Sequence, residues 1–465
     1  MECHIATQPT MKLPTLAVMG VILLAARPSQ AQFSYTITNN SATITGYAGP
    51  GGAVVVPATL GGAPVQALGP QAFFLASEVT SISLPASITN IASGAFAYCF
   101  SLDSINVNVT NTYYTSVGGV LYDATQETLV QYPGGLTEDF TIPDGVTTIG
   151  SEAFFSDQLT GVTIPASVTT IANAAFVSCL QLQNFTVDPG NLFFSAVGGV
   201  LFNFDRTSLI QYPAELPGSS YAIPSTVLNI GNYAFGSAYN LTSLSIPPSV
   251  NSLGILPFFE CVSLLAINVD PANLDYSSRN GVLFNRDQSS LISFPPGLKG
   301  SYVVPKGITS IGFQAFAYST LSSVTLPASL TTIQDYGFAY SQQLTTATFL
   351  GNPPVFDATA FVGDTLEFLY LPGAIGWTSP LDGVPALLWN PVIQSNASSP
   401  AIVNNNFGFT ITGTSNINVS VQSTTNLAGG TWLPAQQVTL VNGSSYFSVP
   451  ANTNIPASFF RLSTP

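Results

Sequence analysis

Apolar and polar residues alternate in short runs that recur along most of the chain. The segment VTSISLPASITNIASGAFAYCFSL (79–102) is matched by LTGVTIPASVTTIANAAFVSCLQL (159–182), LTSLSIPPSVNSLGILPFFECVSL (241–264) and LSSVTLPASLTTIQDYGFAYSQQL (321–344). Neighbouring units are offset by 22 or 23 residues, as from Phe154 to Phe176 and from Phe73 to Phe96. Alternation of Leu, Val and Ile with Ser and Thr predicts a strand that buries one face.

Two further features recur in each unit. A proline follows the apolar end of the strand and stops it, because proline cannot donate to a strand ladder. These prolines are Pro85, Pro143, Pro165, Pro224, Pro247, Pro305, Pro327 and Pro372. A small residue followed by phenylalanine comes later in the unit, and we expect the ring to fill a coil. These pairs are Ala72-Phe73, Ala95-Phe96, Ala153-Phe154, Ala175-Phe176, Ala234-Phe235, Ala315-Phe316, Gly337-Phe338 and Ala360-Phe361. One unit cannot bury its own apolar face, so the pattern predicts a solenoid of stacked coils.

A longer period is superimposed on the short one. Pro143, Pro224 and Pro305 lie 81 residues apart. Between pairs of short units, each super-repeat carries two apolar runs around a polar turn. The three copies are 119–122 with 129–133, 199–202 with 209–213, and 281–284 with 291–295. Each copy predicts a β-hairpin inserted into the solenoid.

The order of strand, proline, Ser-Val, Ile, Gly and Ala-Phe-x-x-Cys resembles the BspA-like leucine-rich-repeat family of bacterial secreted and surface proteins. The Gly-Val-Leu-Tyr/Phe hairpin and the opening stretch TITNNSATITGYAGPGGAVVVP (36–57) are also similar to that family. The resemblance covers roughly residues 33–390 and rests on about nine repeat units. It implies a mainly β leucine-rich-repeat solenoid that is secreted or surface-exposed and acts in adhesion and protein binding.

The N-terminus has the pattern of a signal peptide. Lys12 supplies the positive charge, residues 13–26 are apolar but too short to span a bilayer, and Ser29-Gln30-Ala31 fits a cleavage site. We therefore expect residues 1–31 to be removed, with Met11 as the true start. The product is expected to be secreted, extracellular or associated with the cell surface. No later segment has the length and apolar character of a transmembrane helix.

Charge and residue types exclude several classes of function. The formal net charge is −14, and Lys and Arg form no cluster, so a nucleic-acid partner is excluded. Loss of residues 1–31 would also remove the only histidine, His4. Without histidine, Ser-His-Asp and Cys-His sites are absent, and the scattered acids disfavour a paired-carboxylate glycosidase. The sequence predicts a non-enzymatic protein with no cofactor and no metal.

Cys99, Cys179 and Cys261 each lie three residues after a repeat phenylalanine. Their coils are at least two strand steps apart, about 10 Å or more, whereas a disulfide needs Cα atoms within about 7 Å. We expect buried free thiols, and the same geometry disfavours zinc. The turns Asp188-Pro189-Gly190-Asn191 and Asp270-Pro271-Ala272-Asn273 are expected to be capped by their own side chains, with a calcium site the less favoured alternative.

The repeat stops after Trp389. We predict a solenoid with an N-terminal cap over 32–389, a linker over 390–400, and a small all-β, sandwich-like module over 401–465. In the module, STTNLAGGTW (423–432) and SFFRL (458–462) resemble a C-terminal β-module of many secreted bacterial proteins. Trp432 is a candidate sugar-stacking platform, although such a tryptophan more often belongs to a core.

Hydroxyl side chains on the solvent side of the strands are the candidate binding surface, because solenoids commonly bind through such faces. They are Thr80, Ser81, Ser83, Thr160, Thr163, Thr242, Ser243, Ser245, Ser322, Ser323 and Thr325, continued by Thr345, Thr346 and Thr348. A merely soluble β face would have the same composition. The leading hypothesis is a non-catalytic adhesion protein whose ligand is a protein or a host or envelope surface. The alternatives are a glycan-binding accessory protein and a structural component of the envelope or matrix.

Overall fold

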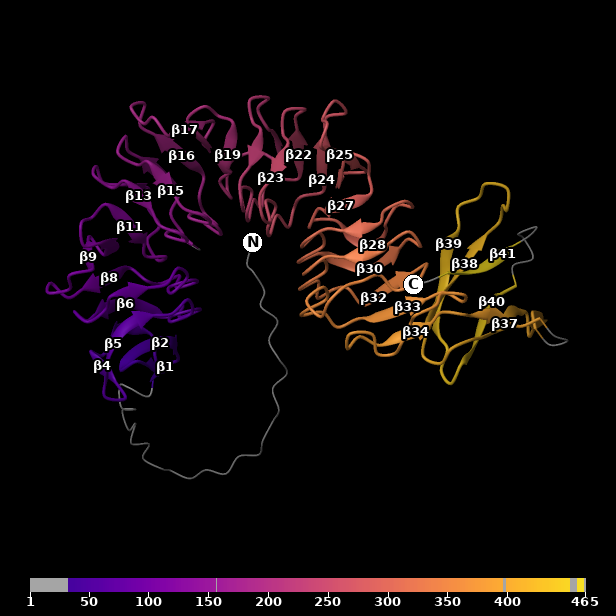
Figure 1. Ribbon diagram of the computed structural model, residues 1–465. Helices are drawn as coiled ribbons and strands as arrows, with labels where there is room; N and C mark the ends of the chain where they lie inside the picture. The colour runs from indigo at the N-terminus through magenta and orange to yellow at the C-terminus, as the bar shows by residue number, and fades with distance from the viewer. Residues whose placement is uncertain (1–31, 156, 396–398, 452–457, 464–465) are drawn as a thin grey trace, which may run out of the picture.

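The structure, a computed structural model, describes residues 32–155, 157–395, 399–451 and 458–463. The helices and strands that can be assigned in these ranges are all β-strands. Stacked coils form an arc, and a separate β-module follows at its C-terminal end (Figure 1). The predicted mainly β solenoid is confirmed. The signal peptide predicted at 1–31 lies outside the described residues.

One side of the solenoid consists of parallel strands, one per coil, which we call the strand face. Partners are equivalent residues of successive coils, such as Val162 with Phe185 and Leu244 with Ile267. Strands β6 and β14 end directly before Pro85 and Pro165, as predicted for a residue that cannot continue the ladder. The sheets are β3-β6-β8, β12-β14-β16, β20-β22-β24 and β28-β30-β32-β33-β34. Their strands are β3 (Gly52–Val55), β6 (Val79–Leu84), β8 (Ser104–Val107), β12 (Phe140–Thr141), β14 (Gly161–Ile164), β16 (Asn184–Val187), β20 (Ser220–Ala222), β22 (Ser243–Ile246), β24 (Ala266–Val269), β28 (Lys299–Val303), β30 (Thr320–Leu326), β32 (Thr346–Phe349), β33 (Glu367–Tyr370) and β34 (Ala386–Leu388).

A second side carries short parallel strands and the three inserted hairpins. The predicted hairpins are confirmed as antiparallel pairs, and each has a third strand in front of it that the sequence pattern did not predict. The hairpin sheets are β9-β10-β11-β13-β15, β17-β18-β19-β21-β23 and β25-β26-β27-β29-β31. Their strands are β9 (Tyr114–Val117), β10 (Val120–Asp123), β11 (Thr128–Gln131), β13 (Thr148–Ile149), β15 (Thr170–Ile171), β17 (Phe194–Val197), β18 (Val200–Asn203), β19 (Ser208–Gln211), β21 (Asn229–Ile230), β23 (Ser252–Leu253), β25 (Tyr276–Arg279), β26 (Val282–Asn285), β27 (Ser290–Ser293), β29 (Ser310–Ile311) and β31 (Thr332–Ile333). The N-terminal sheet contains β1 (Phe33–Thr38), β2 (Ser41–Tyr47), β4 (Thr59–Leu60), β5 (Ala63–Leu68) and β7 (Asn90–Ile91).

A column of aromatic rings runs through the core. The repeat phenylalanines are buried, and those of adjacent ordinary coils are in ring contact; Phe316 and Phe338, for example, have ring centroids 4.6 Å apart. In the hairpin coils, Tyr132, Tyr212 and Phe294 take the phenylalanine position and contact the next ring at 4.9–5.2 Å. The rings therefore join ordinary and hairpin coils into a stack with shared interfaces.

A buried asparagine holds the entrance to the second hairpin and another holds the entrance to the third. In the second hairpin coil, Asn191 Nδ2 donates to the carbonyls of Pro165 and Val168 at 2.8 and 2.9 Å. Its Oδ1 accepts from the backbone N–H groups of Phe193 and Phe194 at 2.8 Å each. Asn273 makes the same set of contacts in the third hairpin coil. The side-chain-capped turns are confirmed, since Asp188 and Asp270 each accept from the backbone two residues on.

The substitution Asn191→Ala is expected to lower the free energy of unfolding by about 2 kcal/mol, because it leaves backbone donors and acceptors unpaired in the core. Chemical denaturation measures the change. Asn184→Ala, at an exposed position of the same coil, is the control and should change stability by less than about 0.5 kcal/mol. Equal losses in the two variants would contradict the role assigned to Asn191.

The C-terminal module consists of two sheets that share one core. The sheets are β35-β37-β36 with β40 paired to β37, and β39-β38-β41. Their strands are β35 (Val392–Ile393), β36 (Ala401–Val403), β37 (Asn406–Thr412), β38 (Asn418–Thr424), β39 (Leu433–Thr439), β40 (Ser444–Pro450) and β41 (Phe459–Ser463). Phe409 of one sheet and Val421 of the other belong to the same buried cluster, as expected for a sandwich. Strand β35 lies within the segment predicted as a linker and pairs with β37.

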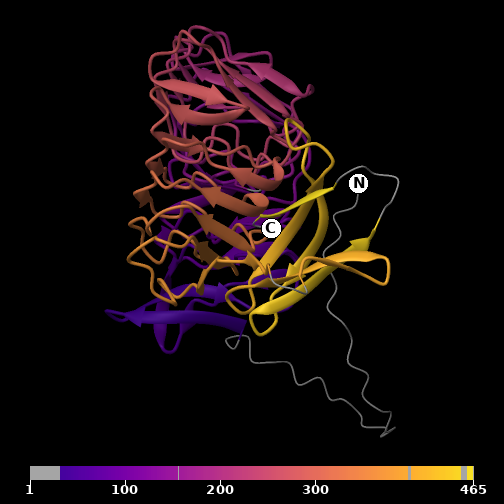
Figure 2. The ribbon, with the colours of Figure 1, turned by 90° about the vertical axis from the view of Figure 1, so that its right-hand side faces the viewer.

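The module packs against the strand face at its C-terminal end (Figures 1 and 2). Leu369 of β33 belongs to the buried cluster of the module, and Trp389 Nε1 donates to the carbonyl of Asn418 at 3.2 Å. Thr348 is the register partner of Leu369 and is 2% exposed, and Thr346 is also buried. The prediction that Thr346 and Thr348 face solvent is therefore wrong, because this end of the face is covered.

Candidate functional site

The third side of the solenoid consists of the turns that carry the small-Phe pairs. In the hairpin coils this turn is replaced by a short segment such as Tyr212-Pro213, and the turns on either side then meet across it. Asn232 Nδ2 donates to Asn173 Oδ1 at 3.4 Å across the second hairpin coil. The rings of Phe259 and Tyr318 lie 5.3 Å apart across the third. The hairpin coils therefore separate their neighbours less at this side than at the strand face, and the arc curves towards the turns. We call this side the inner face.

Most of these turns hold residues in the left-handed backbone region, two positions before and two positions after the core phenylalanine. Glycine occupies such a position at Gly94 and Gly363, with φ of 72° and 81°. Five of the other positions carry tyrosines, which have φ between 53° and 61°, and the rest carry Leu75, Glu152, Ala174, Ser178, Ser237, Leu256, Glu260 and Gln314. These tyrosines are Tyr98, Tyr233, Tyr318, Tyr336 and Tyr340. A bulky residue pays about 1 kcal/mol or more for this conformation, so the rings are held outside the core at an energetic cost.

These tyrosines and neighbouring phenylalanines lie along the inner face. We define the inner aromatic strip as Phe74, Tyr98, Phe155, Tyr233, Phe259, Phe313, Tyr318, Tyr336 and Tyr340. Ring contacts divide the strip into three groups, with centroids 5.3–6.1 Å apart between contacting rings. The groups are Phe74-Tyr98-Phe155, Tyr233-Phe259-Tyr318-Tyr340 and Phe313-Tyr336. Tyr318 and Tyr340 are 38% and 42% exposed. The strip presents aromatic area to solvent at positions where the fold does not require it.

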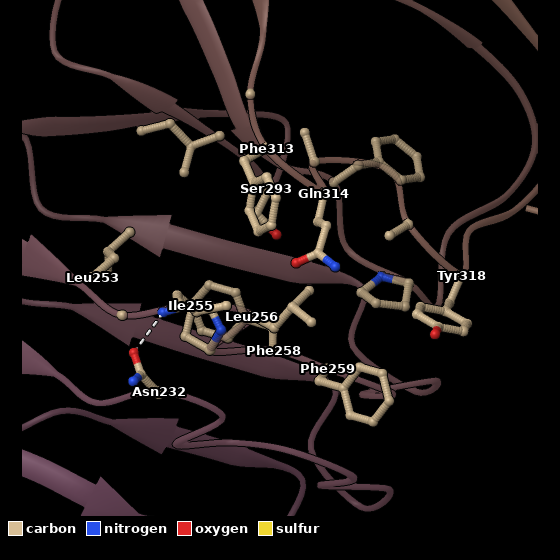
Figure 3. Close-up of a pocket in the computed structure, with 18 of the residues that line it drawn as sticks. Asn232, Leu253, Ile255, Leu256, Phe258, Phe259, Ser293, Phe313, Gln314 and Tyr318 are labelled. Atoms are coloured by element: carbon tan, nitrogen blue, oxygen red, sulfur yellow. Dashed lines mark hydrogen bonds between the residues drawn. The ribbon is translucent and has the colours of Figure 1, made fainter. Parts of the chain in front are cut away.

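A groove of about 530 Å³ opens on this face at the third hairpin coil (Figure 3). Its walls are the turn from Gly254 to Glu260 and the turn from Gly312 to Tyr318, and its floor is the hairpin coil around Ser293 and Phe294. Most of the lining is apolar, with Ile255, Leu256 and Phe313 among the side chains around the cavity. The volume is that of a typical binding pocket.

One position in the floor explains why this groove is larger than its counterpart at the second hairpin coil. The hairpin coils carry Gln131, Gln211 and Ser293 at the same place, before the core aromatic residue. Gln131 and Gln211 are buried and donate to the carbonyl of the following tyrosine at 2.9 and 3.2 Å. The cavity beside Gln211 measures about 220 Å³. At Ser293 the long side chain is missing, and the space above the floor is open.

Two polar side chains of the groove, Gln314 and Glu260, have acceptor atoms that could bind a ligand. Gln314 Oε1 is buried and accepts no hydrogen bond from the described residues. Glu260 accepts a hydrogen bond from Ser237 Oγ at 3.2 Å, and burial raises the pKa of its carboxyl group. Other acceptors are engaged, since Asn232 Oδ1 accepts from Ile255 N and Gln334 Oε1 from Phe313 N. The groove therefore offers one unpaired acceptor and one half-buried acid.

The strand-face hydroxyls predicted as a binding surface do not converge on a site. Thr80, Ser245 and Ser322 are exposed. The half-buried members are Ser81, Ser83, Thr160, Thr163, Thr242, Ser243, Ser323 and Thr325. Several of these hydroxyls are engaged within the solenoid: Ser323 Oγ donates to Ser301 Oγ at 2.8 Å, and Thr242 Oγ1 donates to the carbonyl of Ser219 at 2.8 Å.

Trp432 is half-buried, and the Arg461 guanidinium lies 4.5 Å from its ring centroid. A cation at this distance covers one face of the indole. A sugar could therefore stack only on the other face.

The three cysteines of the repeats occupy one column of the core. Cys99, Cys179 and Cys261 are buried free thiols, which confirms the predicted burial. Each donates from Sγ to the carbonyl of a phenylalanine of an earlier coil, at 2.9–3.2 Å. Burial raises the pKa of Cys99 and of Cys261 to about 12. Protonated, buried thiols of this kind fill space and donate, and they are poor nucleophiles.

The described part of the chain contains no group of three or more His, Cys, Asp or Glu side chains placed to hold a metal ion. Among the same residues, no helix has the length and apolar character needed to cross a membrane.

Comparison with protein families decides what kind of repeat this is. Residues 61–118, 132–208, 214–301 and 297–376 match the BspA-type leucine-rich repeat region, in six copies. These segments make up more than half of the chain. The chain belongs to the BspA-type leucine-rich-repeat family.

Solved structures of leucine-rich repeat proteins resemble this member of the BspA-type family. A leucine-rich cell surface protein from Faecalibacterium prausnitzii is 25% identical, over 72% of this chain and 93% of the other, with a TM-score of 0.34. A leucine-rich repeat protein from Eubacterium ventriosum is 21% identical, over 76% and 98%, with a TM-score of 0.40. The pneumococcal vaccine antigen PcpA is 19% identical, over 73% and 86%, with a TM-score of 0.33. A comparison with curated proteins gives no match.

Membership of the BspA-type family indicates a surface-associated, protein-binding role and a class of protein that is generally non-catalytic. Within this frame, sequence reasoning missed the inner aromatic strip and the groove. A signal for the strip is present, because aromatic residues recur within three positions of the core phenylalanine, as at Tyr98, Tyr318 and Tyr340. The change from Gln131 and Gln211 to Ser293 is a signal for the groove.

Proposed function

We propose that this protein is secreted or displayed at the cell surface, binds other proteins through its inner face, and has no catalytic activity. The observation that carries the proposal is that tyrosine, a bulky residue, occupies five of the left-handed positions of the inner-face turns, although glycine fits the equivalent positions at Gly94 and Gly363. Glycine would satisfy the backbone at no cost. Tyrosine at the same places supports selection for a surface ligand.

The chemistry of the strip favours a protein ligand. Tyrosine is enriched at the centre of protein interfaces, because a rigid ring buries a large area and its hydroxyl group can form a hydrogen bond. The rings of Tyr318 and Tyr340 stack at 5.3 Å, so little conformational entropy is left to lose on binding. The net charge of −14 favours partners with basic surfaces.

A photo-crosslinking experiment tests both the function and the face. Benzoylphenylalanine is placed at Tyr340 on the inner face or at Ser245, which is exposed on the strand face. The mature chain is exposed to native envelope and extracellular proteins. We expect specific adducts from Tyr340 that excess unlabelled chain suppresses, and few from Ser245. Adducts from Ser245 alone would assign binding to the strand face. An absence of adducts from both positions would overturn the protein-binding proposal.

The double substitution Tyr318→Gly and Tyr340→Gly separates binding from folding. Glycine relieves the left-handed strain, so thermal stability should change little, whereas the removed rings should weaken competition for the adducts by about ten-fold or more. The control is Tyr446→Gly, because Tyr446 is 52% exposed in the C-terminal module. Unchanged competition by the double variant would contradict the role of the strip.

A further inference from the structure

We propose that the groove of the third hairpin coil is a socket for one arginine or lysine side chain of a partner protein. The inference rests on the proposed function and names the chemistry that its inner face recognises. Three observations carry it: the depth of the groove, the kind of polar atom that it leaves free, and the charge around it.

The depth is created by a residue that departs from the repeat. Ser293 stands where Gln131 and Gln211 fill the floor of the other hairpin coils. Above Ser293, the apolar side chains of Ile255 and Phe313 line the two opposite walls (Figure 3). Arginine and lysine carry long aliphatic stems that lie well against apolar surface while the head group reaches polar atoms. A short polar side chain would leave these walls uncovered.

The polar atoms of the groove favour a ligand group that donates hydrogen bonds. Gln314 Oε1 is buried and has no hydrogen-bond partner among the residues that the structure describes, and such an unpaired acceptor costs about 1–3 kcal/mol until a donor reaches it. Glu260 adds a carboxylate at the same groove, held by Ser237 Oγ. A group that carries several N–H bonds and no lone pair can donate to both of these acceptors at once, as ammonium and guanidinium groups do.

The surroundings favour a positive charge. The rings of Phe259 and Tyr318 meet at an interplanar angle of 87° beside Glu260, and aromatic faces attract cations. The chain as a whole has 22 acidic and eight basic residues, so its field attracts a basic segment. A glycan or an acidic peptide would bring neither the charge nor the excess of donors.

The test uses the mature chain and three peptide probes: acetyl-Leu-Arg-Leu-amide, its lysine analogue, and its citrulline analogue, which keeps the shape of arginine without the charge. We expect calorimetric titration to detect the arginine or the lysine peptide, with the citrulline peptide about ten-fold weaker or more. Equal affinity for citrulline and arginine would overturn the assignment to a cation. So would the absence of binding by both basic peptides at their highest soluble concentration.

Two variants locate the binding. Ser293→Gln installs the residue that the other hairpin coils use, so it should fold normally and weaken the peptide by about ten-fold or more through loss of the cavity. Gln314→Leu should raise thermal stability by removing an unpaired acceptor, yet weaken the peptide; leucine is compatible with this left-handed position, as Leu256 shows with φ of 44°. Ser301→Gln, exposed on the strand face, is the control. Unchanged affinity in Ser293→Gln would overturn the assignment to this groove.

Two further outcomes separate the socket from the broader proposal. If Ser293→Gln loses the peptide but keeps the Tyr340 adducts, the socket stands as a site separate from the contacts that those adducts report. If it keeps both, the socket fails while inner-face binding stands. Self-association of the wild-type chain that Ser293→Gln abolishes would overturn the assignment to a different protein and name a second copy as the occupant.

Discussion

Phe316→Ala is expected to lower the free energy of unfolding by about 4 kcal/mol, the typical cost of deleting a buried phenylalanine ring. Phe316 is fully buried and stacks on Phe294 at 4.9 Å and on Phe338 at 4.6 Å. Its removal leaves a cavity between two coils. The backbone hydrogen bonds from Phe294 N to Ala315 O and from Phe316 N to Gly337 O fix the spacing of the coils. The cavity can therefore collapse only in part.

The loss should be local, because a solenoid transmits stability mainly between neighbouring coils. Hydrogen exchange is expected to accelerate in β29, β30 and β31, while β6 and β8 keep their protection. Phe193→Ala, at a position 49% exposed, is the matched control and should cost less than about 1 kcal/mol. A uniform rise in exchange along the whole chain would contradict the nearest-neighbour description.

Asp157→Ser is expected to raise the free energy of unfolding by about 3 kcal/mol at pH 8, the scale of an uncompensated buried charge. Asp157 is 0% exposed, and neither of its carboxyl oxygens has a hydrogen-bond partner within the part of the chain that the structure describes. It stands three residues after Phe154, the position at which Cys99 and Cys179 donate to a phenylalanine carbonyl. Ser341 fills this position in a later coil and donates to the carbonyl of Phe316 at 2.7 Å, so serine suits the column.

The same feature predicts an unusual dependence of stability on pH. Burial raises the pKa of Asp157 well above its usual value, and burial raises the pKa of Asp364, which is at the same column position, to about 7. The folded state therefore binds protons more tightly than the unfolded state. The stability from these two groups is complete below the unfolded pKa of about 4 and is lost as pH rises through the folded values.

Thermal denaturation at pH 5 and pH 8 measures this dependence. We expect the wild type to have a higher melting temperature at pH 5 than at pH 8. The double substitution Asp157→Ser and Asp364→Ser should remove most of this difference. Asp382→Ser, at an exposed position, controls for the general repulsion among acidic residues, which also weakens at low pH. An equal difference in the double variant and in the wild type would show that the two buried acids do not cause it.

The features that could be predicted from the sequence are those that repeat. Pro85 and Pro165 mark strand ends because proline acts locally, and the Gly-Val-Leu-Tyr/Phe hairpins follow from local turn chemistry. The burial of Cys99, Cys179 and Cys261 follows from their fixed distance to the core rings. These inferences need only one coil and its neighbour.

The features that could not be predicted depend on how the coils are tilted or on contacts between distant segments. The convergence of Phe259 and Tyr318 requires the wedge shape of a hairpin coil, which no single unit reveals. The burial of Thr346 and Thr348 requires the C-terminal module to lie over β32 and β33, although their alternating pattern resembles that of an exposed strand. The groove requires both the missing glutamine at Ser293 and the turns on either side.

Because there is one hairpin coil per 81 residues, the number of candidate binding gaps increases with the number of super-repeats in the chain. Each super-repeat brings one gap in the inner wall, and one side chain, at the position of Gln131, Gln211 and Ser293, sets how much of that gap is filled. A chain lengthened by whole super-repeats would gain gaps one at a time while keeping its curvature. A substitution at one gap could then change which ligand that gap binds, while the other gaps keep their binding properties.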